Sequence, residues 1–406
     1  MNKFKQYSLI ISGFAIGQGS MFLAQTWLVT QERFELLAAV GIGLGMLSLL
    51  QWAADCGGIY LLPRQMSEAN DFQSKFWAFV FARLIFSSLF IIIIVLILSL
   101  IDVNHITYNI VIYGSLTSFI WSFNISGLLD SKKLNQIAGP LSGLCWVFAS
   151  LPVFFLSDSK YFAELLGVSY SLGLLLTVFI QYFSLRNSIL DLKFTSFSLA
   201  LVKEQIIKGS TYNGAYITSQ AYGRTIPILV DKLIDSYFAG IYVYAKNIAN
   251  TASQFIEFSR RVEFSSIVNL VRSNKFDVFS ILSRQKLSFA IVGSFVIVVT
   301  LSFLVLNYYG NADHLLIAEV TLILVAILFL WTISSSLGQA LVALEKTGYY
   351  ALTITSTLLL SIIFISSSIE NIGLTGIYIG EGSMFIIQSI LYVSYLKKNA
   401  VQKNYE

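Results

Sequence analysis

The chain has 406 residues, of which 56% are hydrophobic and only 12% are Asp, Glu, Lys or Arg. A soluble globular domain carries roughly 25% charged residues, so this composition and the mean hydropathy of +0.74 exclude an ordinary soluble domain. The net charge of +4 comes from loops that flank apolar segments, and no nucleic-acid-binding surface is expected.

Apolar stretches of about 20 residues, each long enough to cross a hydrocarbon core of about 30 Å, recur along the whole chain. Taken in order, the predicted spans cover roughly residues 7–29, 36–62, 76–101, 106–129, 135–157, 162–185, 207–230, 233–257, 287–309, 315–343, 348–368 and 372–396. The first stretch lacks a small-residue cleavage site, so we interpret it as a permanent span. Cys56 and Cys145 both fall within spans, and neither a disulfide nor a metal site is expected.

The loops between these spans alternate between basic and poor in basic residues. About 20 of the 26 Lys and Arg residues lie on one side, and only Arg33, Lys160 and Lys232 lie opposite. Because basic loops stay in the cytoplasm, both termini are predicted to be cytoplasmic.

The sequence predicts an all-α, polytopic membrane protein of about 12 transmembrane helices in two halves. A six-helix lobe, residues 1–186, precedes a cytoplasmic linker, 187–206, and a second six-helix lobe, 207–406. The ends of the fourth and tenth spans are weakly alike, which indicates a parallel repeat. Transporters built from such repeats place the substrate path between the halves.

Few charges fall inside the predicted spans, and such residues are functional candidates by default. Arg224, on the seventh span, lies too deep to reach the interface easily, and is expected either to line a cavity or to pair with Asp231 or Asp235. Lys246, on the eighth span, has no acid within one helical turn, which favours a water-filled lumen. Arg83 lies about 12 Å into the third span, where its long side chain is expected to reach the interface, although it is kept among the substrate-binding candidates.

Asp55 and Glu381 are the deep acidic residues. Asp55 either pairs with Arg64 or Arg83 or serves as a protonatable group that changes charge during a transport cycle, and Glu381, between Gly380 and Gly382, has the same two interpretations. The second interpretation implies coupling to an H⁺ or Na⁺ gradient. No resident cofactor is expected.

Further polar and basic residues are candidates for lining the substrate path or for gating it. Gln25 and Gln51 either line a polar path or join neighbouring helices. Arg64, Arg260 and Arg261, near predicted cytoplasmic ends, are candidates for a cytoplasmic gate.

Two segments resemble the Wzx-type polysaccharide flippases. Residues 231–246, DKLIDSYFAGIYVYAK, are similar to that family's mid-chain signature, in which an Asp, a hydrophobic pair, a Gly and a Tyr-x-x-Ala element join the seventh and eighth spans. The segment Gly13–Gln25, followed by ADCGG at 54–58 and Pro-Arg at 63–64, resembles the family's opening pair of helices. Cys56 stands where an aromatic residue is commoner.

This resemblance implies a member of the multidrug/oligosaccharidyl-lipid/polysaccharide (MOP) exporter superfamily, with MATE-like lobes around a central cavity. The implied cargo is an undecaprenyl-diphosphate-linked O-antigen or capsule repeat unit, turned from the cytoplasmic to the periplasmic leaflet of a bacterial inner membrane. Membrane lipids, a polysaccharide polymerase and a chain-length regulator are the implied partners. In this interpretation Arg224 and Lys246 offset the desolvation of the diphosphate.

Two other functions stay open at this point. A MATE-like drug or cation antiporter would prefer acidic residues in its lumen, and Asp55 and Glu381 keep that alternative open. A membrane polymerase or ligase would need a large outer loop, whereas each predicted outer loop has about ten residues or fewer. His105 and His314 lie in separate short loops without a nucleophile, and no phosphate-binding loop predicts ATP hydrolysis.

Overall fold

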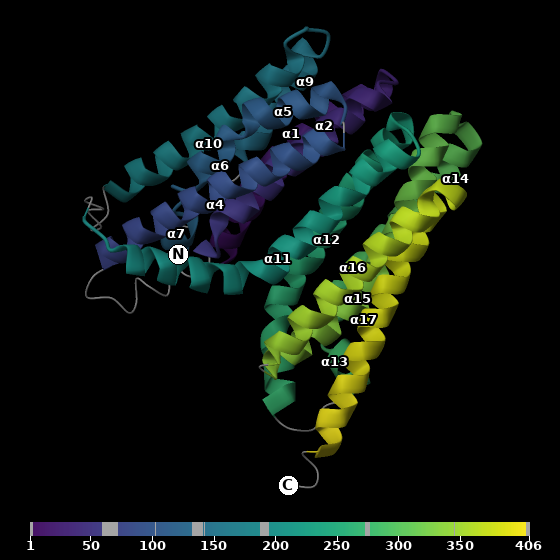
Figure 1. Cartoon of the computed structure of the whole chain (residues 1–406). Coiled ribbons are helices and arrows are strands. Elements are labelled where there is room, and N and C mark those ends of the chain that lie inside the picture. The colour runs from purple at the N-terminus through teal and green to yellow at the C-terminus, as the bar shows by residue number, and fades with distance from the viewer. Residues whose placement is uncertain are drawn as a thin grey trace. The chain divides into compact units, whose positions relative to one another are not determined.

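The computed structural model describes residues 3–58, 72–101, 103–131, 141, 143–186, 195–272, 277–344 and 346–402. Within these ranges every regular element is an α-helix. In chain order (Figure 1) the helices are α1 (Lys3–Thr30), α2 (Phe34–Asp55), α4 (Phe72–Leu100), α5 (His105–Gly114), α6 (Leu116–Trp121), α7 (Ser126–Ser131), α9 (Leu144–Leu156), α10 (Phe162–Arg186), α11 (Leu199–Leu233), α12 (Ser236–Arg272), α13 (Val278–Ser283), α14 (Lys286–Tyr309), α15 (Ala312–Ala343), α16 (Thr347–Ile372) and α17 (Leu374–Gln402).

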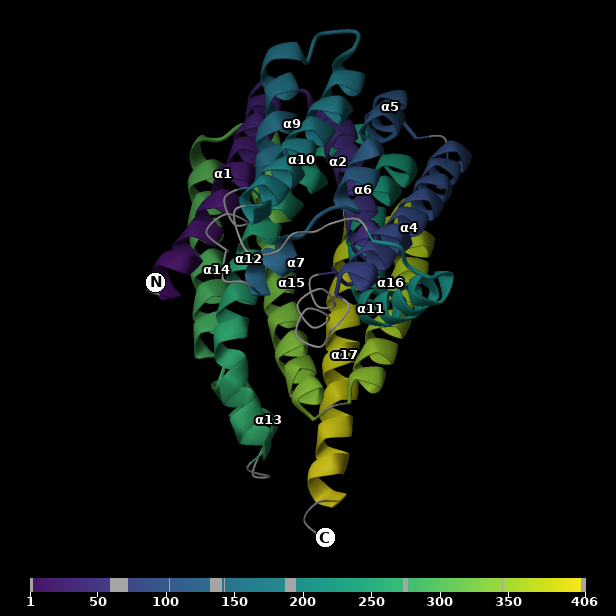
Figure 2. The ribbon, with the colours of Figure 1, turned by 90° about the vertical axis from the view of Figure 1, so that its left-hand side faces the viewer.

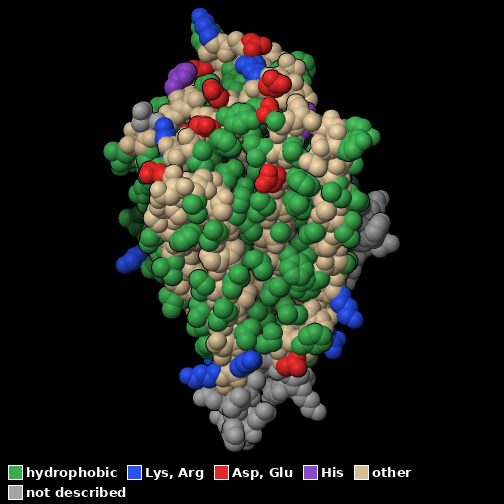
Figure 3. All heavy atoms as spheres, turned by 90° about the vertical axis from the view of Figure 1, so that its right-hand side faces the viewer, with side chains coloured by type: hydrophobic (Ala, Val, Ile, Leu, Met, Phe, Trp, Pro, Cys, Tyr) green, Lys and Arg blue, Asp and Glu red, His purple; other side chains and the backbone are tan. Residues whose placement is uncertain are grey.

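The predicted all-α membrane fold is confirmed. Among the described residues, 7 helices are long and apolar enough to cross a membrane: α2, α4, α10, α14, α15, α16 and α17. The face in Figure 3 carries a broad band of hydrophobic side chains, with Lys, Arg, Asp and Glu concentrated towards its two ends. The chain is therefore a multi-pass membrane protein, and the figure of about 12 spans stays a prediction.

The chain divides into two compact units, Met1–Arg224 and Thr225–Glu406. The boundary lies inside α11, which already begins at Leu199 within the predicted linker 187–206. The six-helix lobes 1–186 and 207–406 stay a prediction.

The predicted fourth span, 106–129, is a broken helix rather than a continuous one. α6 ends at Trp121 and α7 begins only at Ser126. Between them, the side-chain oxygen of Asn124 accepts a hydrogen bond from the backbone N–H of Ser126 at 3.0 Å. Such a local bond offers the backbone an alternative to the helix, which the apolar pattern did not reveal.

In the first unit, α10 packs along α9 and α5, and α2 packs against α4, α5 and α6; Figure 2 shows α9 beside α10. Glycines allow the crossing of α1 and α9. A Cβ at Gly143 would lie 2.2 Å from the carbonyl oxygen of Gly13, and one at Gly17 would lie 2.4 Å from Cα of Gly143. The backbones therefore touch directly, as small residues allow in membrane helices.

The start of α11 belongs to the first unit. Val202 packs against Ala78 and Ala82 of α4, and the Ser74 hydroxyl donates to the carbonyl of Ser196 at 3.1 Å. These contacts fix where α11 enters its path.

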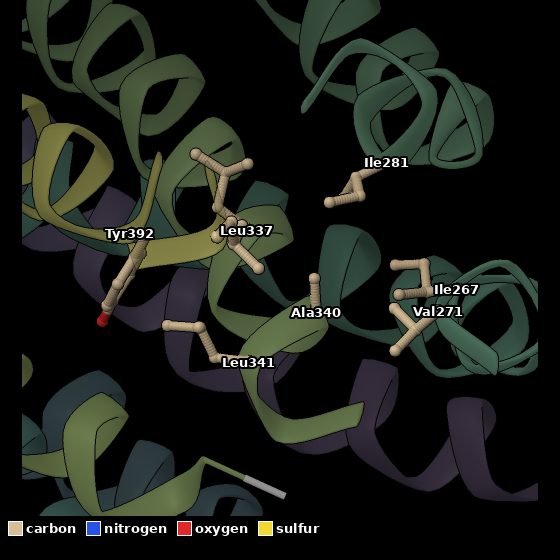
Figure 4. Packing of buried hydrophobic residues seen from close by; sticks show 8 residues of the cluster. Ile267, Val271, Ile281, Leu337, Ala340, Leu341 and Tyr392 are labelled. Carbon is tan, nitrogen blue, oxygen red and sulfur yellow. The ribbon is translucent and has the colours of Figure 1, made fainter. Parts of the chain in front are cut away.

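In the second unit α15 is the central helix, and it packs against α12, α14 and α17. A hydrophobic cluster fills the junction of α12, α13, α15 and α17 (Figure 4) and consists of Ile267, Val271, Ile281, Leu337, Ala340, Leu341, Tyr392 and Leu396. Gln388 of α17 links two other helices: its amide accepts from Ser334 at 2.9 Å and donates to Thr357 at 2.7 Å. These contacts order α15, α16 and α17 around the position of Glu381.

The crossing of α1 and α9 gives a test of packing. We expect Gly143→Ala to destabilise the protein by about 1–3 kcal/mol, because the new methyl group would overlap backbone atoms that cannot move separately. Gly19→Ala is the matched control, since a Cβ there meets nothing within 4 Å. Thermal unfolding in detergent measures both, and equal midpoints would contradict the crossing.

Candidate functional site

Asp55 and Arg83 form a buried ion pair in the first unit. Nη2 of Arg83 lies 2.7 Å from Oδ1 of Asp55, and the two side chains are only 4% (Asp55) and 2% (Arg83) exposed. The indole N–H of Trp121 donates to the same carboxylate oxygen at 3.1 Å. The guanidinium also lies 4.5 Å from the ring centroid of Phe79, within cation–π range.

Arg83 is placed by two helix ends. Its Nε donates to the carbonyl of Asp55 at 2.9 Å, and its Nη1 donates to the carbonyl of Asn124 at 2.7 Å. The first carbonyl belongs to the last residue of α2, and the second lies in the break between α6 and α7. Neither carbonyl can therefore accept a hydrogen bond from a following turn of helix. The cation also opposes the partial negative charge at the C-terminus of α2.

The backbone after α2 makes room for this guanidinium. Cys56 and Gly57 have φ values of 49° and 73°, so the chain leaves the helix through the left-handed region. A Cβ at Gly58 would lie 1.6 Å from Nη2 of Arg83. The sequence Asp-Cys-Gly-Gly therefore both ends α2 and admits the arginine.

These contacts test the ion pair expected for Asp55. Of its two possible partners, Arg83 is confirmed, whereas Arg64 lies outside the described residues. The expectation that Arg83 reaches the membrane interface is wrong, because the side chain turns inward and each guanidinium nitrogen donates inside the unit. A role for Asp55 or Arg83 in transport stays a prediction.

Lys246 and Glu381 form a second pair, in the second unit. Nζ of Lys246 lies 2.8 Å from Oε1 and 3.0 Å from Oε2 of Glu381. The Tyr242 hydroxyl donates to Oε1 at 3.3 Å, and its ring centroid lies 5.8 Å from the ammonium. The lysine side chain is 23% exposed, whereas the glutamate is 3% exposed.

Helical spacing and a glycine position these groups. Tyr242 and Lys246 are four residues apart on α12 and so share one face. On α17, Gly380 lets the helix approach α16 closely, since a Cβ there would lie 2.4 Å from Cγ1 of Ile365. Glu381 is thereby held inside the unit, where Lys246 reaches it.

The sequence did not reveal this pairing. Helical spacing reveals an ion-pair partner only when it lies within about one turn on the same helix, whereas the partner of Lys246 is 135 residues away on α17. Tyr242 was missed as well, because its contact with the site is a hydrogen bond to the same distant residue, Glu381. One signal was present: Lys246 and Glu381 are opposite charges inside predicted spans, and such residues often pair with one another.

Arg224 lies on α11 against a glycine of α2. A Cβ at Gly45 would lie 3.2 Å from Cδ of Arg224, so the arginine side chain crosses α2 where that helix has no side chain. Gln51, further along α2, is buried, and its side-chain N–H₂ has no hydrogen-bond partner among the described residues. Gln25 on α1 is buried as well.

The acids named as alternatives for Arg224 have local hydrogen bonds. Asp231 accepts from the Ser236 hydroxyl at 2.6 Å. Asp235 accepts from the backbone N–H of Phe238 at 2.8 Å, in the first turn of α12. Both contacts shape the turn between α11 and α12.

Of the three arginines named for a cytoplasmic gate, Arg260 has a described side chain. It is buried, donates from Nη2 to the carbonyl of Ser335 at 2.8 Å, and lies 5.2 Å from the ring centroid of Trp331. Arg64 and the side chain of Arg261 lie outside the described residues, so the gate stays a prediction.

No protein-family model and no curated protein matches the sequence. Solved structures do match. "Lipid II flippase MurJ, inward closed conformation" has a TM-score of 0.73 at 14% identity, over 96% of this chain and 87% of that chain. An inward-facing MATE family multidrug resistance transporter of the MOP superfamily has a TM-score of 0.64 at 14% identity, over 99% and 96%. The MATE multidrug transporter DinF-BH has a TM-score of 0.65 at 14% identity, over 98% and 96%. At such low identity these likenesses show the fold, which is that of MurJ and the MATE transporters.

The Asp55–Arg83 pair predicts a stability effect. We expect Asp55→Asn to reduce the free energy of unfolding by about 3–5 kcal/mol, because a buried guanidinium loses its counter-charge. The matched control is Asp158→Asn, which breaks the exposed Arg33–Asp158 pair (2.8 Å; side chains 31% and 89% exposed) and should cost no more than about 1 kcal/mol. Unfolding titrations with SDS compare the two variants, and equal losses would show that the buried pair is not structural.

Proposed function

We propose that the protein is a flippase that moves an undecaprenyl-diphosphate-linked oligosaccharide, such as an O-antigen or capsule repeat unit, from the cytoplasmic to the periplasmic leaflet of a bacterial inner membrane. The observation that carries this proposal is Lys246 on α12: its ammonium is paired with the buried Glu381, yet 23% of the lysine side chain is exposed. The chain shares its fold with a lipid II flippase. The cargo in that protein's name is itself a lipid, which supports a lipid-linked cargo here.

The chemistry of the cargo favours basic side chains. A diphosphate and a hydroxylated glycan cannot cross hydrocarbon without losing their hydration, and this loss costs a large amount of free energy. Charge-assisted hydrogen bonds from Lys246 and Arg224 would replace part of that hydration. The polyprenyl tail needs no such help, because the bilayer is its natural solvent.

A MATE-like cation antiporter is the second candidate, and the acidic residues argue against it. A cationic drug needs a carboxylate that is free to bind it. Asp55 and Glu381 already bind Arg83 and Lys246 within their own units. A cation would therefore have to displace a built-in cation from a largely buried pair.

We further propose that transport is coupled to an H⁺ or Na⁺ gradient, with Glu381 as a better candidate than Asp55. The carboxylate of Asp55 is enclosed by donors that also hold a helix end. Glu381 is bound by a lysine with an exposed side, so its charge can change without breaking the helix ends.

The proposed cellular setting follows from the cargo and the loop charges. We propose that both termini lie in the cytoplasm, since the basic loops favour that orientation. A polysaccharide polymerase and a chain-length regulator are proposed as partners at the periplasmic face, because they would consume the translocated unit. Membrane lipids surround the apolar band.

The cargo proposal predicts a loss of surface polysaccharide in point variants. In a strain that lacks the gene, we expect Arg224→Ala to restore less than about a tenth of the wild-type output, because a charge-assisted contact of about 1.5–3 kcal/mol is removed. Lys208→Ala is the matched control: it lies on the same helix, in an exposed pair with Glu204. Membrane levels of both variants are measured by immunoblot, and normal output from Arg224→Ala at normal level would remove Arg224 from the mechanism.

Gradient coupling is tested in proteoliposomes with lipid-linked oligosaccharide extracted from the same strain. We expect the rate of translocation to change when a proton or a sodium gradient is imposed, and Glu381→Gln to abolish that response. Asp55→Asn, if it folds, should keep it. Translocation that ignores both gradients would end the coupling proposal while leaving the flippase proposal intact.

A further inference from the structure

The ammonium of Lys246 already has an anion bound to it. Glu381 offers both carboxylate oxygens, at 2.8 and 3.0 Å, and the Tyr242 hydroxyl supports one of them at 3.3 Å. An anionic cargo that uses Lys246 must therefore compete with a carboxylate that is built into the protein. Carboxylate and phosphate oxygens both accept charge-assisted hydrogen bonds from an ammonium, so a phosphate can take the place of a carboxylate there.

The two buried pairs differ in how far their cations are enclosed. Each guanidinium nitrogen of Arg83 donates to a backbone or carboxylate oxygen, and the side chain is 2% exposed. Lys246 contacts Glu381 and Tyr242, and 23% of its side chain stays exposed. A second anion can approach Lys246 but has no comparable access to Arg83.

We propose that Glu381 acts as an exchangeable internal counter-ion, which holds Lys246 when the site is empty and yields it, by taking up a proton, when the diphosphate of the cargo binds. This inference rests on the proposed function and specifies how one of its contacts works. It makes Glu381 a residue that sets the affinity for anions rather than a direct ligand of the cargo.

The exchange is balanced in charge and in protons. In the empty site the ammonium and the carboxylate sum to zero. When an anion binds, one proton from solvent converts the carboxylate to a carboxylic acid, and the ammonium keeps all its protons and turns to the new anion. Without that proton the buried carboxylate would face the incoming phosphate without its counter-charge, which a low-dielectric site opposes.

The groups around Glu381 are compatible with one titrating site. From α12 it faces Lys246 and Tyr242. Tyr378 of α17 lies near both Glu381 and Glu319 of α15, and Glu319 is exposed. From α16 the neighbours of Gly380 are Ile365 and Phe364, which are apolar. Glu381 is therefore the buried acid in this cluster of described residues.

The test uses farnesyl diphosphate, a short prenyl diphosphate, and purified full-length protein in detergent. Binding is measured at about pH 6 and about pH 8 for the wild type, for Glu381→Gln and for the control Glu319→Gln. At about pH 8 we expect Glu381→Gln to bind farnesyl diphosphate at least about tenfold more tightly than the wild type does, because its neutral amide no longer competes for Lys246. The double variant Lys246→Gln/Glu381→Gln should lose that gain, and Glu319→Gln should behave as the wild type.

Proton uptake on binding is a second measurement, and its result does not depend on whether Glu381→Gln binds more tightly than the wild type. Calorimetry in two buffers of different ionisation enthalpy should show about one more proton taken up per diphosphate by the wild type than by Glu381→Gln. Titration of the diphosphate itself cancels in this difference. If Glu381→Gln misfolds, proton uptake per bound diphosphate is compared between the wild type and Glu381→Asp. The shorter side chain of Glu381→Asp weakens the pair with Lys246, and we expect this variant to take up fewer protons than the wild type.

The outcomes separate the two proposals. Equal affinity and equal proton uptake in the wild type and in Glu381→Gln, with clear binding in both, would overturn the counter-ion exchange and leave the flippase standing. No binding of farnesyl diphosphate by any form would count against the anionic cargo itself.

Discussion

A charge inside a membrane protein must be neutralised or used, because hydrocarbon offers it no hydration. Both described units of this chain contain such a charge, and both meet it with an opposite charge from a distant helix. The difference lies in what surrounds each pair. Arg83 is buried between helix ends, whereas Lys246 is partly exposed. On that difference we base a structural role for the first pair and a functional role for the second.

The first pair also stabilises the broken helix of the first unit. A helix that ends within the protein leaves carbonyl groups without partners, and each such group costs free energy when it is buried. Arg83 donates to one carbonyl at the end of α2 and to another in the break between α6 and α7. One arginine thus stabilises two interruptions, while Asp55 and Trp121 keep its charge balanced and its orientation fixed.

The sequence predicted those features that repeat along one helix. The length of the apolar stretches predicted the all-α membrane fold, because that signal is local. The break at Asn124 was missed, since a single asparagine in an apolar run gives a weak signal. The partner of Asp55, 28 residues away, was among the expected ones, but the partner of Lys246 was not. Which faces of two distant helices meet depends on packing, such as the close approach at Gly380, and helical periodicity carries no information about it.

A flippase for a lipid-linked sugar determines on which side of the membrane that sugar is found. In cells depleted of the protein, a membrane-impermeant probe applied to spheroplasts should no longer reach the lipid-linked oligosaccharide, which should accumulate and be identifiable by mass spectrometry of the extracted lipids. If the oligosaccharide stayed as accessible from outside as in undepleted cells, with no accumulation, the chain would not be the flippase for that lipid.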